Sequence, residues 1–109
     1  MEEQMYEMED TVELGGNIQL SGFKDVDSGS MIILKKIIGN YVKQFSECND
    51  GFECLKLTMK KIHETENSSK FDVRAQLTIS GTPYNSDHID RNIFMTVDKA
   101  LKKIEATVI

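Results

Sequence analysis

The chain has 109 residues, of which 39% are apolar and 28% are charged. This length suits one domain with a modest core, and the composition is typical of a folded chain rather than a disordered one. No apolar run approaches the about 20 residues that a membrane helix needs. The acidic N-terminus also lacks the basic start and apolar stretch of a secretory signal. We therefore expect a cytoplasmic protein with no membrane association.

The net charge of −5 is unevenly placed along the chain. Residues 1–10 contain five carboxylates and no Lys or Arg, whereas residues 11–109 contain 13 acidic and 13 basic residues. Residues 1–12 are predicted to be an acidic flexible tail, and residues 13–109 a single neutral domain. The tail is interpreted either as a solvated terminus or as a segment that competes with nucleic acid for the basic side chains of the domain.

A first strand and a helix are predicted in the N-terminal half. Gly15-Gly16 interrupts the chain, and Asn17 to Phe23 is predicted to be a strand with Ile18 and Leu20 on one face. Gly39 costs the following helix up to about 1 kcal/mol relative to Ala, and close packing of a neighbour is one possible reason for its presence. Possible N-caps of this helix are Asp25, Asp27, Ser28 and Ser30. Its apolar face recurs at steps of three and four: Met31, Leu34, Ile38, Tyr41, Val42 and Phe45.

Three further strands are expected in the C-terminal half. Leu55 to Lys60 alternates apolar and polar residues, and Phe71 to Ile79 does so without a fault. Glu64 to Lys70 is predicted to be a polar hairpin connection. After a turn at Gly81-Thr82-Pro83, Tyr84 to Ile89 is predicted to be an edge strand, because its polar residues have poor strand propensity and discourage pairing between sheets.

The chain closes with an amphipathic helix whose N-cap is expected at Asp90 or Asn92. Its apolar stripe is Phe94, Val97, Leu101, Ile104 and Val108. The predicted fold class is therefore α+β, with the element order β-α-β-β-β-α. Two helices pack on one face of a four-stranded, largely antiparallel sheet, and the other face meets solvent.

No motif indicates catalysis, a cofactor or a metal. Cys48 and Cys54 are too few for a disulfide framework, and together with His63 and His88 they lack the paired spacing of zinc ligands. Both histidines are interpreted as surface residues. Asp98 is interpreted as a structural carboxylate beside the apolar stripe. We expect a protein that is not an enzyme and has no small-molecule substrate, and the oligomeric state is left open.

Three segments carry a resemblance to a known family. Ile18 to Gly22 is similar to its opening strand, Phe71 to Gly81 to its third strand and turn, and Val97-Asp98 with Lys103-Ile104-Glu105 to its closing helix. In this order they resemble the ribosome hibernation-promoting factor family, also called the ribosome-associated inhibitor or sigma-54 modulation protein family. The resemblance spans about Asn17 to Val108.

The resemblance implies a stress-response factor that occupies the decoding region of the small ribosomal subunit, binds its rRNA and keeps the ribosome idle. It implies contacts from Lys and Arg to rRNA phosphates, which position a protein without reading bases. Each of these side chains also has a simpler interpretation, as part of the solvated face of its element. The implied RNA-binding residues are Lys35, Lys36, Lys43, Lys56, Lys60, Arg74, Lys99, Lys102 and Lys103.

Two features depart from the family pattern. The closing helix does not run into a basic tail, and the domain is neutral. They favour an alternative, a protein–protein interaction module of the same fold that has lost ribosome binding. Two other RNA-binding folds fit less well. A double-stranded RNA-binding domain has a lysine cluster where this chain has Asp90-Arg91-Asn92, and an RNA-recognition motif has aromatic residues on its open sheet face.

Overall fold

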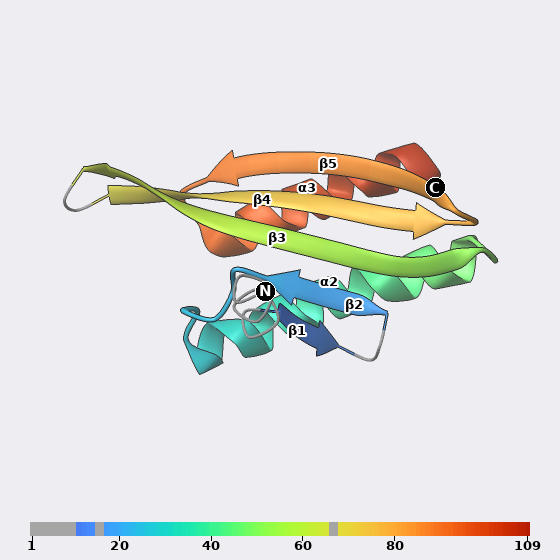
Figure 1. Ribbon diagram of the computed structural model, residues 1–109, viewed down its shortest axis with the longest axis horizontal. Coiled ribbons are helices and arrows are strands. Elements are labelled where there is room, and N and C mark those ends of the chain that lie inside the picture. Colours follow the sequence, from blue (N-terminus) through green and yellow to red (C-terminus); the bar gives the residue numbers. More distant parts are fainter. Residues whose placement is uncertain (1–10, 15–16, 66–67) are drawn as a thin grey trace, which may run out of the picture.

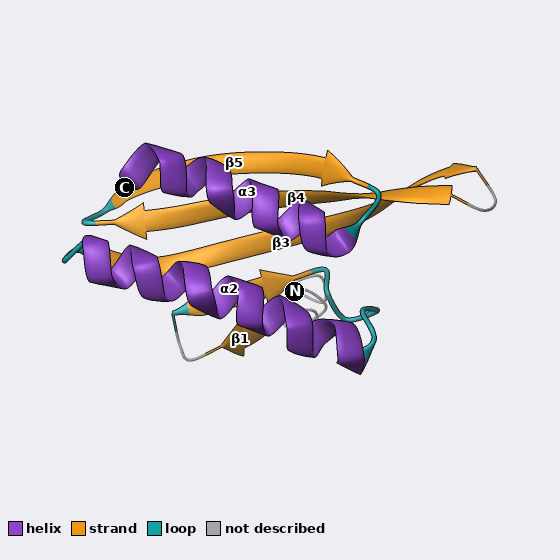
Figure 2. Ribbon diagram, turned by 180° about the vertical axis from the view of Figure 1, so that it is seen from behind, coloured by secondary structure: helices purple, strands orange, loops and turns teal. Residues whose placement is uncertain are grey.

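The computed structural model describes residues 11–14, 17–65 and 68–109, which form two layers, a twisted sheet and a pair of helices (Figure 1). Both helices cover the same face of the sheet (Figure 2). No helix in these residues is long and apolar enough to cross a membrane. The elements are β1 (Thr11–Leu14), β2 (Ile18–Ser21), α2 (Ser28–Cys48), β3 (Phe52–Thr65), β4 (Ser68–Ile79), β5 (Thr82–Asp90) and α3 (Ile93–Val108).

The strands follow one another across the sheet in the order β1-β2-β3-β4-β5. Among the described strands only β2 and β3 run parallel, with α2 as the crossover between them; the other neighbours are antiparallel. The predicted α+β fold and the order β-α-β-β-β-α are therefore confirmed, and β5 lies at an edge as expected. A fifth strand, β1, precedes the predicted elements and pairs with β2, so Thr11 and Val12 of the predicted tail belong to the sheet. Residues 1–10 of that tail lie outside the described residues.

The strands β3 and β4, which form the central hairpin, are both longer than their apolar–polar alternation predicted. The predicted polar connection, residues 64–70, is mostly strand, since β3 runs to Thr65 and β4 begins at Ser68. Beyond the pair of Phe71 with Asp90, β3 and β4 pair only with each other. The result is a two-stranded arm that projects past both helices (Figure 1). The turn that follows β4 consists of Ser80 and Gly81, because Thr82 and Pro83 already belong to β5.

Both helices begin at side-chain caps. Asp27 caps α2, its carboxylate accepting a hydrogen bond from the backbone N–H of Ser30 at 3.0 Å. The Asn92 side chain caps α3 by accepting from the backbone N–H groups of Phe94 and Met95. Such caps satisfy N–H groups that have no partner within the helix. One of the proposed caps for each helix is thus confirmed.

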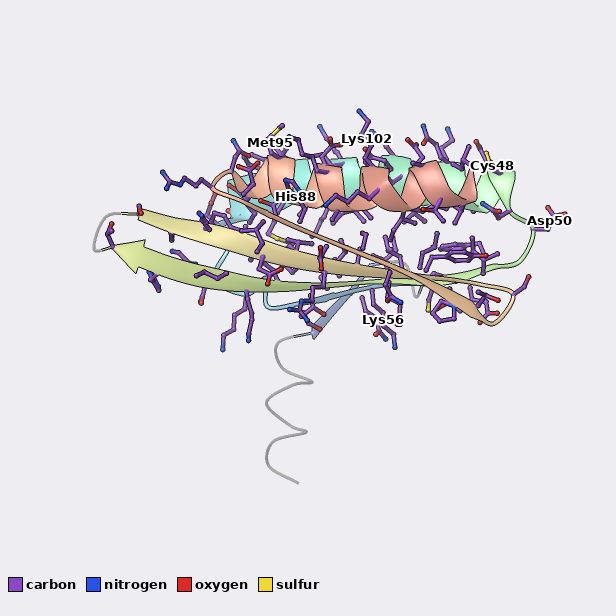
Figure 3. The ribbon with its side chains drawn as sticks, turned by 90° about the horizontal axis from the view of Figure 1, so that it is seen from above. Cys48, Asp50, Lys56, His88, Met95 and Lys102 are labelled. Carbon is purple, nitrogen blue, oxygen red and sulfur yellow. The ribbon has the colours of Figure 1, made fainter. Side chains whose placement is uncertain are left out.

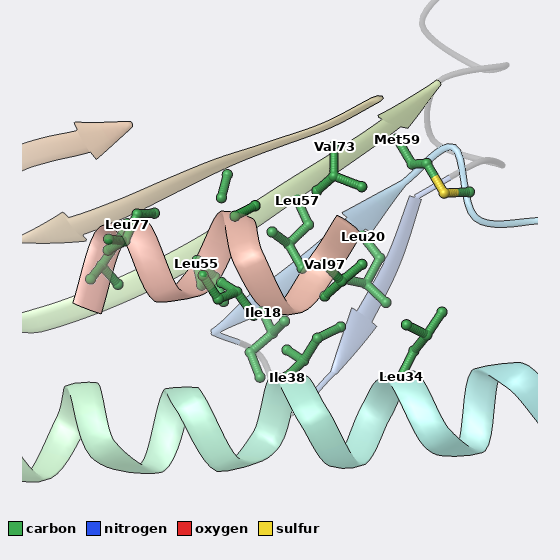
Figure 4. Close-up of a cluster of buried hydrophobic side chains, with 14 of the residues drawn as sticks. Ile18, Leu20, Leu34, Ile38, Leu55, Leu57, Met59, Val73, Leu77 and Val97 are labelled. Carbon is green, nitrogen blue, oxygen red and sulfur yellow. The ribbon is translucent and has the colours of Figure 1, made fainter. Parts of the chain in front are cut away.

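The core lies between the layers and contains the apolar faces that the periodicities predicted (Figure 4). Leu34, Ile38 and Phe45 of α2 are fully buried against the sheet. Their partners on β2, β3 and β4 alternate in and out as strand geometry requires. The buried residues of α3 are Thr96, Val97, Ala100, Leu101 and Ile104, and those of the central strands are Leu55, Leu57, Met59, Val73, Ala75 and Leu77.

Two glycines have different explanations. Gly22 has φ of +83° and lies so close to the backbone carbonyl of Met59 that a Cβ there would overlap it. Glycine is required at that crossing on both grounds. Gly39 is on the exposed side of α2 and a Cβ there would meet nothing within 4 Å. Close packing therefore does not explain Gly39.

Candidate nucleic-acid interface

The helices α2 and α3 lie side by side and form one surface, here called the helix layer (Figure 2). A hydrogen bond joins them, with Tyr41 Oη donating to Asp98 Oδ1 at 2.8 Å. Partial burial and the bond to Asp98 both raise the pKa of Tyr41, because each disfavours the phenolate. The sequence predicted that Asp98 is a structural carboxylate; its partner is Tyr41, and the bond fixes one helix against the other.

The helix layer carries a positive charge although the whole chain is negative. The two helices contain six lysines and only three carboxylates, Glu47, Asp98 and Glu105. One of the three, Asp98, is bonded to Tyr41. All six lysines are exposed: Lys35, Lys36, Lys43, Lys99, Lys102 and Lys103. The layer therefore presents a net positive surface on a chain of net charge −5.

The lysines of α3 differ in their surroundings. Lys102 projects from the helix layer on the side away from the sheet (Figure 3). Lys103 instead extends to the sheet edge, where its ammonium donates to the backbone carbonyl of Asp87 in β5 at 2.6 Å. Because one of its three donors is engaged within the fold, Lys103 is the least available of the six for an external phosphate.

A polar groove of about 200 Å³ runs between the two helices. It is lined by Asn40, Tyr41, Gln44, Lys102 and Glu105. Asn40 and Gln44 are four residues apart and so lie on the same side of α2. These amides carry no charge, so a pattern of phosphate-binding cations in the sequence does not include them. The sequence feature that could have indicated the groove is the four-residue spacing of Asn40 and Gln44 beside Tyr41, a residue of the apolar stripe of α2.

The other three predicted residues, Lys56, Lys60 and Arg74, lie on the opposite face of the sheet, here called the outer face. Figure 3 shows Lys56 on the side of the sheet away from Lys102. Carboxylates lie among these cations. In the strand register Lys60 is opposite Asp72 and Arg74 is opposite Asp87, and Arg74 Nη2 is 3.9 Å from Asp72 Oδ2. The nine predicted residues therefore divide into two surfaces with different electrostatics.

A hollow of about 720 Å³ at the edge of the sheet is broadly open to solvent. Its lining includes Lys56 and Arg74 of the outer face together with Lys103 of α3, so it passes around the edge strand β5. Asp87 of β5 also lines it. The hollow joins the two surfaces at one edge of the molecule.

The histidines and cysteines do not converge. His63 is exposed, while His88 is partly buried on β5 with its Nε2 3.6 Å from Asp90 Oδ2. The carboxyl of Asp90 accepts the backbone N–H of Asn92, which is the main reason that its pKa is lowered. Cys48 is exposed and Cys54 partly exposed, and both are free thiols. Within the described residues, no three His, Cys, Asp or Glu side chains are grouped as metal ligands would be.

Comparison with known proteins gives matches in structure only. No protein-family model and no curated protein matches the sequence. Among solved structures, a ribosomal subunit interface protein from Coxiella burnetii matches with a TM-score of 0.58 and 16% identity, covering 84% of this chain and 90% of that chain. The N-terminal domain of Thermus thermophilus Protein Y matches with a TM-score of 0.56 and 13% identity, covering 84% and 91%.

The predicted family resemblance is confirmed as a resemblance of fold. Because the matches cover most of both chains, the similarity is global rather than one shared motif. At these identities the fold alone is shared, and a fold by itself does not specify a function. The function depends on the helix layer and the outer face, the two charged surfaces of the domain.

Proposed function

We propose that this protein is a ribosome-associated, non-catalytic factor that binds rRNA of the small ribosomal subunit through its helix layer and restrains translation. The observation that carries the proposal is the excess of exposed lysines on that layer, six against three carboxylates. The fold supports it, since one protein with the same fold is described as a ribosomal subunit interface protein.

The lysine positions suit contacts to a phosphate backbone. Lys36 and Lys43 are seven residues apart, close to two helical turns, so they point to the same side of α2. Lys99 and Lys102 are three residues apart and are neighbours on α3. Lysine binds phosphate as a point charge with three donors and needs no fixed geometry. Such contacts position the protein on RNA, and exclusion of other ligands follows from the volume that it occupies.

One observation favours a second function, a protein–protein interaction module. Three large apolar side chains are exposed on the helix layer itself: Ile32 (57%), Ile33 (48%) and Met95 (42%). Phosphate contacts give these side chains no role, whereas a protein partner would cover them. The two functions predict a different dependence of binding affinity on salt, because the release of counterions contributes strongly to affinity for RNA but not to affinity for a protein partner that covers apolar side chains.

Co-sedimentation with ribosomes at low and moderate salt tests the proposal. We expect the protein to migrate with the small subunit and to dissociate as salt rises. A variant with Lys36→Glu, Lys43→Glu and Lys102→Glu should remain at the top of the gradient. Its matched control carries Lys56→Glu, Lys60→Glu and Arg74→Glu on the outer face, which is the same change in charge. The control should still co-sediment.

The outcomes separate the candidate functions. Equal loss of binding by both variants would mean that overall charge, and not the helix layer, determines binding. Unchanged binding by the helix-layer variant would exclude the proposed surface. Binding that resists salt and is lost in an Ile33→Ser, Met95→Ser variant would support the protein-interaction module instead.

A further inference from the structure

A second concave site lies at the end of the molecule where both helices begin. It has a volume of about 200 Å³ and opens between the start of α2, the start of α3 and the sheet. Its floor is apolar and is formed by Val26, Met59, Phe71 and Ile93. Val26, Phe71 and Ile93 are only partly buried, although they pack on the core cluster. This groove is an opening into the hydrophobic core that nothing in the described chain covers.

The rim of the groove carries charge on two sides. Lys61 of β3 lies on the sheet side and is exposed, whereas Asp25 and Asp27 lie on the α2 side. The carboxylate of Asp27 already accepts the N–H of Ser30 as the helix cap. This carboxylate already occupies the N-terminus of α2, whereas α3 begins at the neutral Asn92 and has no acidic residue in its first turn, so its dipole favours negative charge here. An occupant with apolar side chains would complement the floor, and a carboxylate would complement Lys61 and the start of α3 but not the α2 side of the rim.

The chain itself leads to the mouth of the groove. In the sheet Thr11 is opposite Ser21, and Gly22, the next residue after Ser21, lines the groove. Because β1 and β2 are antiparallel, Thr11 lies at the end of β1 nearest Gly22, so residues 1–10 join the sheet at this end. Ten extended residues reach about 33 Å, a large part of the longest dimension of the molecule, 45 Å. Residues 1–10 can therefore cross the groove with chain to spare.

The composition of residues 1–10, here called the leader, matches the groove. It contains Met1, Met5, Tyr6 and Met8, together with five carboxylates and no Lys or Arg. Methionine adapts to irregular apolar gaps. We infer that the leader docks in cis, with one of its Met or Tyr side chains in the groove and with carboxylates directed toward Lys61 and the N-terminus of α3.

Docking would regulate the helix layer, a consequence that rests on the proposed function. The docked leader brings its carboxylates to the end of the helix layer where α2 and α3 begin, and Lys35, Lys36 and Lys99 lie in the N-terminal halves of these helices. Those carboxylates lower the positive potential of the layer and compete with phosphate. An RNA would then bind more tightly to a chain whose leader is removed or displaced.

Methyl labelling of methionine tests the docking directly. The chain has six methionines, of which three lie in the leader, Met59 lies in the groove and Met95 lies outside it. In the full chain we expect nuclear Overhauser contacts between a leader methyl and Met59. Deleting residues 1–10 should shift the Met59 resonance and leave Met95 nearly unchanged. Leader methyls at random-coil positions, with Met59 unaffected by the deletion, would overturn the inference.

Two substitutions serve as a matched pair. Lys61→Glu should weaken the contacts between leader and Met59, whereas Lys60→Glu, one residue away on the outer face, should leave them intact. Substituting Met5, Tyr6 and Met8 by Ser keeps the leader charge and should abolish the contacts. A Met59 shift that depends on protein concentration would identify a second copy as the occupant and overturn docking in cis.

Binding of a fluorescent poly(U) RNA then tests the regulatory consequence. The chain without residues 1–10 should bind this probe several-fold more tightly than the full chain at low salt. Equal affinity would overturn the competition. If neither form binds, the proposed function fails, while the methionine contacts still decide whether the leader docks.

Discussion

The helix layer and the outer face of the sheet both carry exposed cations, yet they differ in how those cations are compensated. On the outer face Arg74 lies 3.9 Å from Asp72, and Lys60 is opposite Asp72 in the register. Among the lysines of the helix layer, Lys103 alone has a described hydrogen bond, to the carbonyl of Asp87 in the sheet. Both regions contain lysines and carboxylates. The potential that a polyanion meets is therefore set by carboxylate placement, which depends on strand register and helix phase.

The largest effect should come from breaking the support of the helix layer. Leu101 is fully buried at the centre of α3. Leu101→Asp places a charge there without a partner, and even truncating a buried Leu to Ala costs about 2–5 kcal/mol. Because whole domains are stable by about 5–15 kcal/mol, we expect loss of the folded state. Circular dichroism melting checks this, with Lys102→Asp at the exposed neighbouring position as the control. A cooperative melt at an unchanged temperature would refute the core assignment.

The second prediction sharpens the electrostatic comparison. If lysines of the helix layer contact phosphates, each substitution by Ala lowers the slope of log K against log salt by about one. The variant Lys36→Ala, Lys43→Ala should therefore show a slope smaller by about two and a binding loss of roughly a hundredfold at low salt, by the same counterion release. Lys56→Ala, Lys60→Ala on the outer face should leave the slope nearly unchanged. Fluorescence anisotropy over a salt series measures both, and equal slopes for the two variants would remove the distinction between the surfaces.

The third prediction concerns the bond that holds the two helices together. Tyr41→Phe removes the hydrogen bond to Asp98 and should destabilise the domain by about 1 kcal/mol in urea unfolding. A double-mutant cycle with Asp98→Asn should give a non-zero coupling, because the two groups are in contact. An additive cycle would mean that the bond is not formed in solution.

The raised pKa of Tyr41 gives this bond a signature in pH. An unfolded tyrosine ionises near pH 10, while the folded Tyr41 keeps its proton there. The folded state then binds more protons than the unfolded state, so stability falls as the pH rises above about 10. This loss should be smaller in Tyr41→Phe. Equal alkaline pH profiles for the two proteins would contradict the assigned cause.

A smaller effect of opposite sign is expected on the exposed side of the helix layer. Gly39 has a helical environment and open space around its Cα. Gly39→Ala should therefore stabilise the domain by up to about 1 kcal/mol through helix propensity alone. Gly22→Ala is the contrasting control, since Gly22 has a positive φ and a Cβ there would overlap the Met59 carbonyl. Urea unfolding of both variants should show changes of opposite sign.

The elements that the sequence predicted correctly are those in which burial alone imposes a period. The stripe of Val97, Leu101 and Ile104 and the alternation of Phe71 to Ile79 follow directly from packing on one face. The strand β5 runs from Thr82 to Asp90, beyond the predicted Tyr84 to Ile89, because its end residues also pair with β4. Its middle is joined to α3, where Ser86 donates to the carbonyl of Ala100 and Lys103 donates to that of Asp87. Such contacts join residues from two elements, and no local pattern contains them.

The candidate site was predictable to a similar extent. Exposure of the six helix lysines followed from helix phase, and so did the placement of Lys56, Lys60 and Arg74 on the opposite face. The bond between Tyr41 and Asp98 joins residues 57 positions apart, and the amides of the inter-helix groove carry no charge pattern. The strand β1 was missed because it follows directly on an acidic stretch without periodicity and is defined by its pairing with β2.

The smallest effect is expected where the outer face compensates its own charge. Arg74 is 73% exposed, and its distance of 3.9 Å from Asp72 is at the limit of an ion pair. Exposed pairs of this kind contribute about 0–1 kcal/mol, so Arg74→Ala should change the free energy of unfolding by less than about 0.5 kcal/mol. High salt should reduce even that, because it screens exposed charges. A loss above 1 kcal/mol in urea unfolding, independent of salt, would mean that Arg74 supports the sheet structurally, and the outer face would no longer serve as the matched control for the helix layer.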